Sequence, residues 1–428
     1  MPDSTVVFLL ALMMGIQPVT TDLYLPALPA LATNLNATMA QAQYTLSALL
    51  LAFGASQLVW GPLSDRFGRK PILITGLAAY VLASIGSAFA GTIDLLIYWR
   101  ILQGLAMGAV VMCGRALVRD LYAPIDGAKV MSKGLSGLGV IACLSAPVGG
   151  LLVSYWNATA TLMALAVFGA LTLWMVLSRF EESLAAKNPK ALQAGTLVST
   201  WWMILKNPVF LTYNALSFAS YGVLFTFLAS SSFVFIKGFG LSAAGYGLVM
   251  FGMSLHYIAG TFLCRHLLVR LGMRHTLAIA GGISLSGGLL MGALFWLGVQ
   301  SAWAIALPFF CMAVGHGIHQ PCGQTGAVGP FPQAAGAASA LNGFLMMVFA
   351  FCTGAWLSTY PSLHSRGDAL PLVIGVLFWT CLLYTSDAAD ERSSVDLGGR
   401  RIIKKKKTIA IGGRRASSRK YENEYYHV

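Results

Sequence analysis

Residues 61–70 read Gly-Pro-Leu-Ser-Asp-Arg-Phe-Gly-Arg-Lys and carry four charges within ten positions. This polar stretch separates two long apolar runs, 41–62 and 71–90. A helix of about 20 apolar residues spans a bilayer, and lipid offers no water to an exposed backbone. The pattern therefore predicts two membrane-spanning helices that are joined by a tight, charged turn at one membrane face.

The composition of the whole chain agrees with a membrane protein. Apolar residues make up 57% of the 428 residues and charged residues only 10%, against roughly 25% charged residues in soluble domains. The net charge of +13 belongs to short loops and to the C-terminal tail, so we expect no nucleic-acid partner. The cysteines are scattered without metal-ligand spacing, and we expect neither a metal nor a cofactor.

Hydropathy along the chain predicts twelve membrane spans, and the longest polar break, 181–206, divides them into two halves. We expect an all-α membrane protein of two pseudo-symmetric six-helix bundles, residues 1–180 and 207–380, whose last helix is incomplete. The central loop, 181–206, is expected to be cytoplasmic. The expected spans are 6–30, 41–62, 71–90, 94–118, 130–153, 159–179, 208–234, 242–264, 276–299, 302–322, 335–357 and 370 onward.

Basic residues distinguish the two membrane faces. The loops on the other side from the N terminus hold only Lys237 and Arg366. Lysine and arginine favour the cytoplasmic face, so both termini are expected in the cytoplasm. The bacterial inner membrane, where we expect the chain, is implied by the family resemblance described below. The basic residues on the expected cytoplasmic side are Arg66, Arg69, Lys70, Arg115, Arg119, Lys129, Lys133, Arg179, Lys187, Lys190, Lys206, Arg265, Arg270 and Arg274.

The two halves contain a faint internal repeat. Residues 265–274 align with residues 61–70, which places Gly272 opposite Gly68 and Val269 opposite Asp65. Two related halves around a central site suit a transporter that works by alternating access.

Six patches of the sequence form recognisable motifs. They are 22–29 (DLYLPALP), 61–70, 100–104 (RILQG), 115–122 (RALVRDLY), 146–150 (APVGG) and 329–339 (GPFPQAAGAAS). Together they resemble the major facilitator superfamily of secondary transporters over about residues 1–380, and within it the bicyclomycin-resistance (Bcr/CflA) branch of drug:proton antiporters. The resemblance implies multidrug efflux, in which protons are exchanged for small apolar or cationic drugs.

The chain has no nucleotide-binding motif, so the expected driving force is an ion gradient. The expected partners are protons, small-molecule drugs and the lipid bilayer, and the chain is expected to be a monomer. An enzyme is not expected, because no nucleophile–base set stands out. Two alternatives remain open: an exporter of one metabolite, such as an amino acid or a sugar, and a non-transporting membrane sensor or scaffold.

Asp22 and Arg100 are the leading candidates for coupling. A carboxylate in an apolar helix is costly unless it is paired, hydrated or protonated. Arg100 lies at a similar depth in the fourth span, and the resemblance implies that both helices line the central cavity. We expect a switchable interaction between the two charges, assisted by Gln103. The alternatives are that Asp22 caps a helix end and that Arg100 braces neighbouring helices.

The charged turn is expected to act as a conformational latch. Asp65 is suited to accept hydrogen bonds from the amide end of a neighbouring helix and to pair with an arginine. Arg115 and Asp120 are expected to pair and shape a cytoplasmic gate, or else to lie at the membrane interface. The latch residues are Gly61, Asp65, Arg66, Gly68, Arg69 and Lys70.

Pro147, Gly149 and Gly150 resemble the antiporter signature of the fifth helix, where a proline bends the helix and glycines admit a neighbour. Plain small-residue packing is the alternative.

Polar residues in both halves are candidates for the cavity wall. His316, His319 and Gln320 fall at i, i+3 and i+4 and share one helix face, either lining the cavity or packing tightly. Gln17 and Asn214 are further candidates, on spans one and seven.

The tail differs from the rest of the chain. Residues 381–390 read CLLYTSDAAD and resemble a translated sequencing adapter. We expect the natural sequence to end near Thr380 and the remainder, 381–428, to be a disordered read-through. The alternative is a basic cytoplasmic tail that is attracted to anionic lipid.

Overall fold

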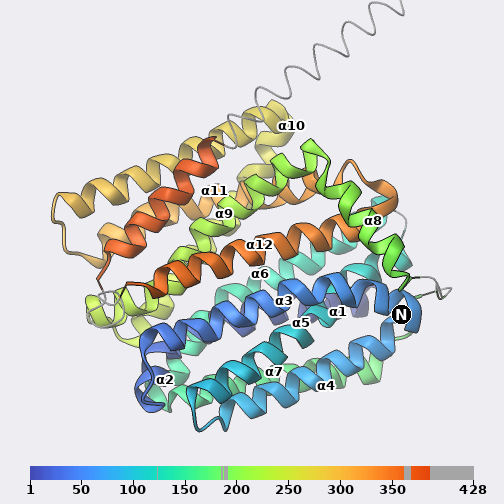
Figure 1. Cartoon of the computed structure of the whole chain (residues 1–428), viewed down its shortest axis with the longest axis horizontal. Coiled ribbons are helices and arrows are strands. Elements are labelled where there is room, and N and C mark those ends of the chain that lie inside the picture. The colour runs from blue at the N-terminus through green and yellow to red at the C-terminus, as the bar shows by residue number, and fades with distance from the viewer. Residues whose placement is uncertain (123, 185–186, 188–190, 361–367, 386–428) are drawn as a thin grey trace, which may run out of the picture.

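The structure is almost entirely helical (Figure 1). It is a computed structural model and describes residues 1–122, 124–184, 187, 191–360 and 368–385. The first half consists of α1 (Asp3–Asp22), η1 (Leu25–Ala27), α2 (Leu28–Asn34), α3 (Met39–Phe67), α4 (Arg69–Ala88), α5 (Ile93–Leu121), α6 (Pro124–Tyr155) and α7 (Ala158–Arg179). The second half consists of α8 (Ala194–Leu205), α9 (Pro208–Ser232), η2 (Phe233–Gly238), α10 (Ala243–Trp296), α11 (Ala302–Val328), η3 (Pro332–Ala334), α12 (Ala335–Ser358) and a last helix, Leu370–Thr385.

The apolar runs form the expected spans. Among the described residues, ten helices are long and apolar enough to cross a membrane. Helix α10 supplies two of the expected spans, because it breaks at Gly272, where φ is 73°. Its first part runs parallel to α11 and its second part antiparallel, as the glycine contacts of the two parts show. The short apolar helix Leu370–Thr385 lies where the incomplete last span is expected, and it is shorter than the other spans. The prediction of twelve membrane helices is therefore confirmed.

Two glycines make the internal repeat visible in the backbone. Gly68 ends α3 with φ 109°, and its aligned counterpart Gly272 breaks α10 with φ 73°. Residues with a side chain rarely adopt such a positive φ, whereas glycine adopts it without strain. Both charged turns therefore reverse the chain by the same device.

Two bundles, α1–α7 and α9 to the last helix, meet along two helix pairs. Helix α3 lies beside α12, as Figure 1 shows, and α6 lies beside α10. A methyl group added at Gly54 would come within 2.5 Å of Met347, and one added at Gly150 within 2.5 Å of the carbonyl oxygen of Ala243. At these two glycines the backbone of one bundle therefore lies directly against a side chain or the backbone of the other. Neither position has room for a larger residue.

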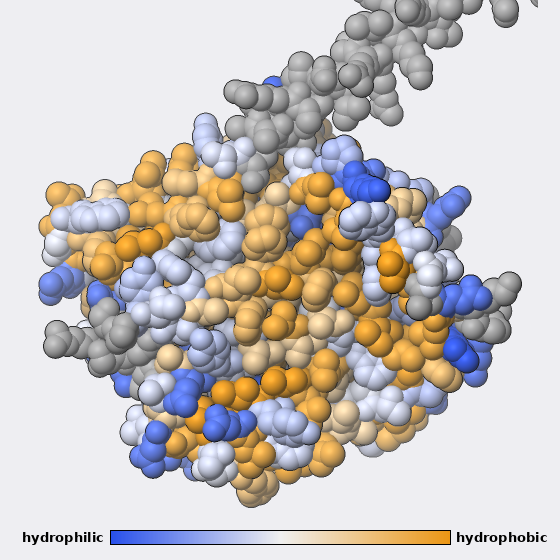
Figure 2. Space-filling model, viewed as in Figure 1, coloured by the Kyte–Doolittle hydropathy of each residue, from blue (hydrophilic) through white to orange (hydrophobic). Residues whose placement is uncertain are grey.

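The surface divides into an apolar middle and two polar ends. In Figure 2, apolar side chains cover the middle of the visible face, and polar ones gather toward its ends. We call the end that carries the N terminus, residues 61–70 and α8 the basic end. The end that carries residues 22–29 is called the opposite end. This division, with the long apolar helices, makes the chain a multi-pass membrane protein.

Two expectations about the connecting segments need correction. The central loop 181–206 is not plain loop, because it contains α8. Disorder was expected from residue 381, but the last helix continues to Thr385 and buries Leu383. Residues 386–428, the rest of the expected read-through tail, lie outside the described residues, as do Lys190 and Arg366.

Candidate functional site

Asp22 stands where the first span is interrupted. Helix α1 ends there because Pro26, four residues on, has no N–H to donate to the carbonyl of Asp22. The side chain is half-buried and accepts a hydrogen bond of 2.8 Å from the hydroxyl of Thr21. The turn that follows Asp22, η1, contacts both α9 and α10 of the second bundle. The carboxylate therefore lies at the boundary between the two bundles, near the opposite end.

Arg100 lies beside the same segment but binds other groups. Its guanidinium is fully buried and donates to the carbonyl of Thr20 at 3.2 Å and to the amide oxygen of Gln103 at 2.6 Å. It also lies over the ring of Tyr24. The first and fourth spans are thus neighbours at this depth, as predicted. Among the described residues, however, no ion pair joins Arg100 to Asp22.

Gln103 extends the Arg100 contacts to the third span. Its amide nitrogen donates to the hydroxyl of Ser84 on α4 at 2.6 Å. Thr20, whose carbonyl binds Arg100, is itself hydrogen-bonded through its hydroxyl to Tyr80 of α4 at 2.6 Å. Three helices of the first bundle therefore share one polar network around a single buried cation, which is the bracing role that the sequence left open.

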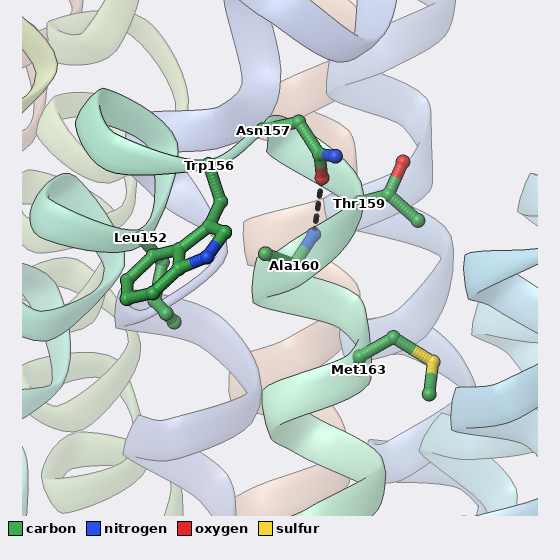
Figure 3. Close-up of a pocket in the computed structure, with 6 residues that line it drawn as sticks. All are labelled: Leu152, Trp156, Asn157, Thr159, Ala160 and Met163. Atoms are coloured by element: carbon green, nitrogen blue, oxygen red, sulfur yellow. Dashed lines mark hydrogen bonds between the residues drawn. The ribbon is translucent and has the colours of Figure 1, made fainter.

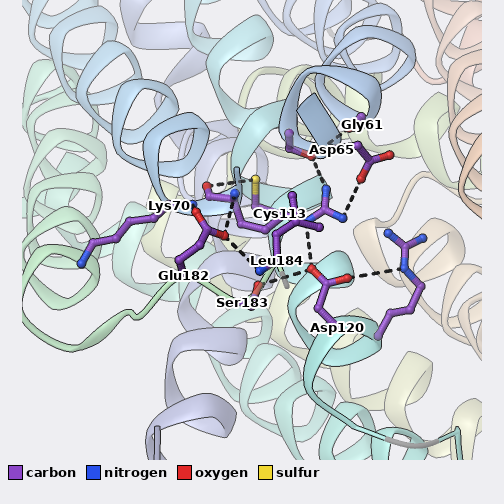
Figure 4. Close-up of polar contacts among 11 residues, drawn as sticks. Gly61, Asp65, Lys70, Cys113, Asp120, Glu182, Ser183 and Leu184 are labelled. Atoms are coloured by element: carbon purple, nitrogen blue, oxygen red, sulfur yellow. Dashed lines mark hydrogen bonds and ion pairs between the residues drawn. The ribbon is translucent and has the colours of Figure 1, made fainter. Parts of the chain in front are cut away.

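The charged turn forms an ion-pair cluster at the basic end (Figure 4). Arg69 is almost fully buried and binds Asp65 at 2.6 Å and Asp120 of α5 at 2.9 Å. It also donates to the hydroxyl of Ser64 at 2.5 Å. The expected pairing of Asp65 with an arginine is present, within the turn itself. The cluster fixes the α3–α4 turn to the end of α5.

The amide end of α4 is bound by Glu182 of the central loop, and not by Asp65 as expected. The two carboxylate oxygens of Glu182 accept from the backbone N–H groups of Arg69 at 2.9 Å and Lys70 at 3.1 Å. Burial would raise the pKa of Glu182, but these and neighbouring backbone N–H donors outweigh it and lower that pKa. A side chain at Gly68 would meet this carboxylate, and the φ of 109° there also favours glycine.

Sequence reasoning missed Glu182 and its neighbour Ser183, which donates to Asp120 at 3.3 Å. Their position directly after the sixth span was the available signal, because a carboxylate at a membrane edge commonly binds a helix N-terminus. Together they attach the start of the central loop to the charged turn of the first bundle.

The prediction that Arg115 pairs with Asp120 is wrong. Asp120 binds Arg69, with Arg119 at a longer 3.9 Å. Arg115 is half-buried and makes no hydrogen bond or ion pair within the part of the chain that the structure describes. Arg119 reaches the start of α12, where Gly336 lies close to its guanidinium. Arg119 therefore faces the second bundle, and the predicted gate pair is not formed.

Pro147 and Gly150 of the fifth span lie in the contact between the bundles. Helix α6 runs from Pro124 to Tyr155 without a break at Pro147. Gly149 packs against the carbonyl of Leu23, and Gly150 packs against that of Ala243. The contact of Gly150 closes the interface between the bundles at the opposite end, whereas that of Gly149 joins α6 to the Asp22 segment of the same bundle.

Three of the cavity candidates of the second bundle are bound separately, whereas the ring nitrogens of His319 have no hydrogen-bond partner among the described residues. His316 is hydrogen-bonded to Ser220 at 2.8 Å, and Asn214 donates to Asn342 at 2.8 Å. The amide nitrogen of Gln320 contacts the sulfur of Met346 at 3.3 Å. His319 is fully buried and Gln17 is half-buried. Most of these side chains bridge helices within the bundle, which favours the packing interpretation.

A surface hollow lies between the ends of α6 and α7 (Figure 3). Its lining has no charged residue, and Asn157 there caps α7 by accepting from the N–H of Ala160 at 2.8 Å. This hollow is therefore no candidate for the coupling site.

Comparisons with known proteins agree with the fold and with the motifs. A family model described as Major Facilitator Superfamily matches residues 6–355. "Multidrug resistance protein D" of Escherichia coli (strain K12) is 27% identical over 381 residues, which are 88% of this chain and 94% of that protein. "Bicyclomycin resistance protein homolog" of Haemophilus influenzae is 27% identical over 375 residues, covering 86% and 92% of the two chains.

The solved structures support the same architecture. A crystal structure of a D-xylose-proton symporter matches with a TM-score of 0.70 over 90% of this chain and 96% of that chain, at 14% identity. At this identity the match concerns the fold alone. Because the family model covers most of the chain and the helices are arranged alike, the chain belongs to the major facilitator superfamily.

Proposed function

We propose that this chain exports small apolar or cationic drugs across the bacterial inner membrane in exchange for protons. The names of the relatives, which refer to multidrug and bicyclomycin resistance, support the drug class. In this proposal the basic end faces the cytoplasm, because positively charged loops are retained on that side.

The placement of Asp22 carries the proposal. Its side chain is half-buried, and η1, the turn that follows it, contacts α9 and α10 of the other bundle. A carboxylate charge there is costly unless it is paired, hydrated or protonated. A proton and a cationic drug therefore compete for one carboxylate. Because each displaces the other, alternate exposure of Asp22 to the two membrane faces yields exchange.

The contacts at the opposite end supply the moving part. Gly150 of α6 packs against the backbone carbonyl of Ala243 of α10, and Gly247 of α10 packs against that of Ala146 of α6. These contacts hold the two bundles together beside the segment that carries Asp22. Rocking of the bundles would part these contacts and open Asp22 to water there. The carboxylate then changes its solvation together with the direction of access.

Aromatic side chains within the second bundle support an apolar substrate class. Phe218 of α9 stacks on Phe349 of α12, with 3.9 Å between the ring centroids, and both are half-buried. Tyr221 lies one turn further along α9. Flat apolar surfaces with few fixed polar groups accept ligands of different shape, as a multidrug site requires.

The test is a panel of drugs in an efflux-deficient host, with and without a protonophore. The parent chain should raise drug tolerance, and the protonophore should remove this effect. Asp22→Asn should abolish the tolerance at unchanged membrane abundance. Asp94→Asn is the matched control, because Asp94 is an exposed carboxylate at the start of α5.

Three outcomes would reject the proposal. Export that persists without a proton gradient excludes proton coupling. Proton-linked export in Asp22→Asn removes Asp22 from the mechanism. Proton movement that is driven only by one metabolite, with no drug tolerated, favours a specific exporter.

A further inference from the structure

Helix α8 (Ala194–Leu205) presents apolar side chains on both of its faces. Its outward stripe contains Val198, Trp202 and Met203, whose exposed fractions are 59%, 60% and 53%. A helix that faces water carries polar or charged residues on this stripe. The exposed face also holds the uncharged Thr196 and Ser199, and its one charge, Lys206, lies one residue beyond the end of the helix.

The inward stripe is already occupied by the protein. Trp201, Ile204 and Leu205 pack in one apolar cluster with residues of α9, α11, η3 and α12. Leu58 of α3, which belongs to the first bundle, packs against the same cluster. The outward stripe is therefore a second, separate apolar face, and nothing in the described part of the chain covers it.

The position of α8 puts this face at the membrane surface. The helix is followed directly by Asn207, which caps α9, so its C-terminal end lies where a membrane span begins. Leu211, one turn into that span, is 47% exposed and continues the outward apolar surface. Figure 1 shows α8 at the basic end, with the N terminus. At 12 residues, α8 is too short to cross a bilayer and instead suits a helix that lies in its surface.

Trp202 and Lys206 form the polar edge of this face. The ammonium of Lys206 lies 5.0 Å from the centre of the Trp202 ring. Tryptophan and lysine are typical of the headgroup level, where the ring enters the acyl boundary and the ammonium reaches phosphate. The charge of Lys206 is positive, so it complements a negative headgroup.

We propose that the outward stripe of α8 is a binding site for anionic phospholipid. Val198, Trp202 and Met203 insert at the acyl boundary, and Lys206 binds the headgroup phosphate. Because the inward stripe packs on the starts of α9 and α12 and on Leu58 of α3, the bound lipid holds the basic end of the second bundle against the first.

The test uses the full chain in vesicles whose phosphatidylglycerol or phosphatidylcholine carries brominated acyl chains, which quench tryptophan on contact. The chain has 10 tryptophans, so the signal of Trp202 is taken as the difference between the parent chain and Trp202→Phe. This difference should be quenched by both lipids at high content, and at several-fold lower content by phosphatidylglycerol. Lys206→Gln should reduce the preference roughly fivefold while quenching persists.

Trp156→Phe is the matched control, because Trp156 is 72% exposed at the opposite end. Its difference signal should be quenched without a preference for phosphatidylglycerol. The proposal is overturned if the fluorescence difference due to Trp202 is not quenched while that due to Trp156 is quenched. In that case water or a second copy of the chain, and not lipid, covers α8. The proposal is equally overturned if the two lipids quench Trp202 alike and Lys206→Gln changes nothing.

Discussion

The guanidinium of Arg100 lies over the ring of Tyr24, with 4.1 Å between its central carbon and the ring centroid. Tyr24 is two residues beyond Asp22, and the carbonyl that Arg100 binds belongs to Thr20, two residues before it. Arg100 therefore contacts the chain on both sides of Asp22 without forming an ion pair with its carboxylate. Its role in the proposed coupling is to position the Asp22 segment.

Replacement of Arg100 should reveal this positioning role. Arg100→Ala should lower the free energy of unfolding by about 2–4 kcal/mol, because a cation–π contact and hydrogen bonds of a buried charge are lost. Tyr24→Phe keeps the ring and loses only the hydrogen bond of 2.7 Å with Thr45, so its cost should be about 1 kcal/mol. Thermal unfolding in detergent compares the two. Equal melting temperatures would contradict the role.

The two acidic partners of Arg69 should contribute unequally. Asp120 is 11% exposed and also accepts from Ser183, whereas Asp65 is 40% exposed. Exposed ion pairs contribute about 0–1 kcal/mol, while breaking a buried pair costs about 3–5 kcal/mol. Asp120→Asn should therefore destabilise the protein by about 2 kcal/mol more than Asp65→Asn. A double-mutant cycle with Arg69→Gln measures both couplings, and a larger coupling for Asp65 would refute the ranking.

The helices were predictable from the sequence because lipid imposes one simple condition. Every backbone group inside the bilayer must be hydrogen-bonded, so each long apolar run becomes a helix whatever it packs against. The turns at Gly68 and Gly272 were equally predictable from the sequence, because the internal repeat aligns these two glycines and glycine is suited to tight chain reversals.

Partners of the charged side chains were much harder to predict. Arg69 binds Asp120, 51 residues away, and its N–H binds Glu182, 113 residues away. A shift of one residue in a span boundary turns a side chain by about 100° around the helix. Boundaries that are known only to a few residues therefore leave the direction of Arg115 open, and its predicted pairing with Asp120 failed.

The attachment of the central loop should depend on pH. The carboxylate of Glu182 is stabilised by backbone N–H donors, so its pKa in the docked loop lies below the ordinary value. Docking should be fully present above the ordinary carboxyl range and weaken as the pH falls through the lowered pKa. In Glu182→Gln, the central loop should bind the start of α4 more weakly, and this binding should no longer depend on pH.

Amide hydrogen exchange of Arg69 and Lys70, corrected for the intrinsic rate, measures the docking of Glu182. The N–H of Ala160 is an internal control, because its cap, Asn157, does not titrate. Protection at Arg69 and Lys70 that changes with pH no differently from that at Ala160 would exclude a titrating cap.

The closed contact at the opposite end should be sensitive to a single methyl group. In Gly150→Ala, the new Cβ would lie 2.5 Å from the carbonyl oxygen of Ala243, so α6 and α10 must separate. Overpacking of this kind costs about 1–3 kcal/mol. Because only the closed arrangement bears that cost, the population open at this end should rise about five- to hundredfold. Gly282→Ala is the matched control, since nothing lies within 4 Å of its added Cβ.

Spin labels at Trp156 and Leu297, in a chain freed of its native cysteines, report the opening. Both residues are exposed, and they lie on different bundles at the opposite end. The distance between the labels should shift to longer values in Gly150→Ala and stay unchanged in Gly282→Ala. If both variants keep the distribution of the parent chain, the glycine contact does not hold the two bundles together, because the added methyl group would then have been absorbed within one bundle.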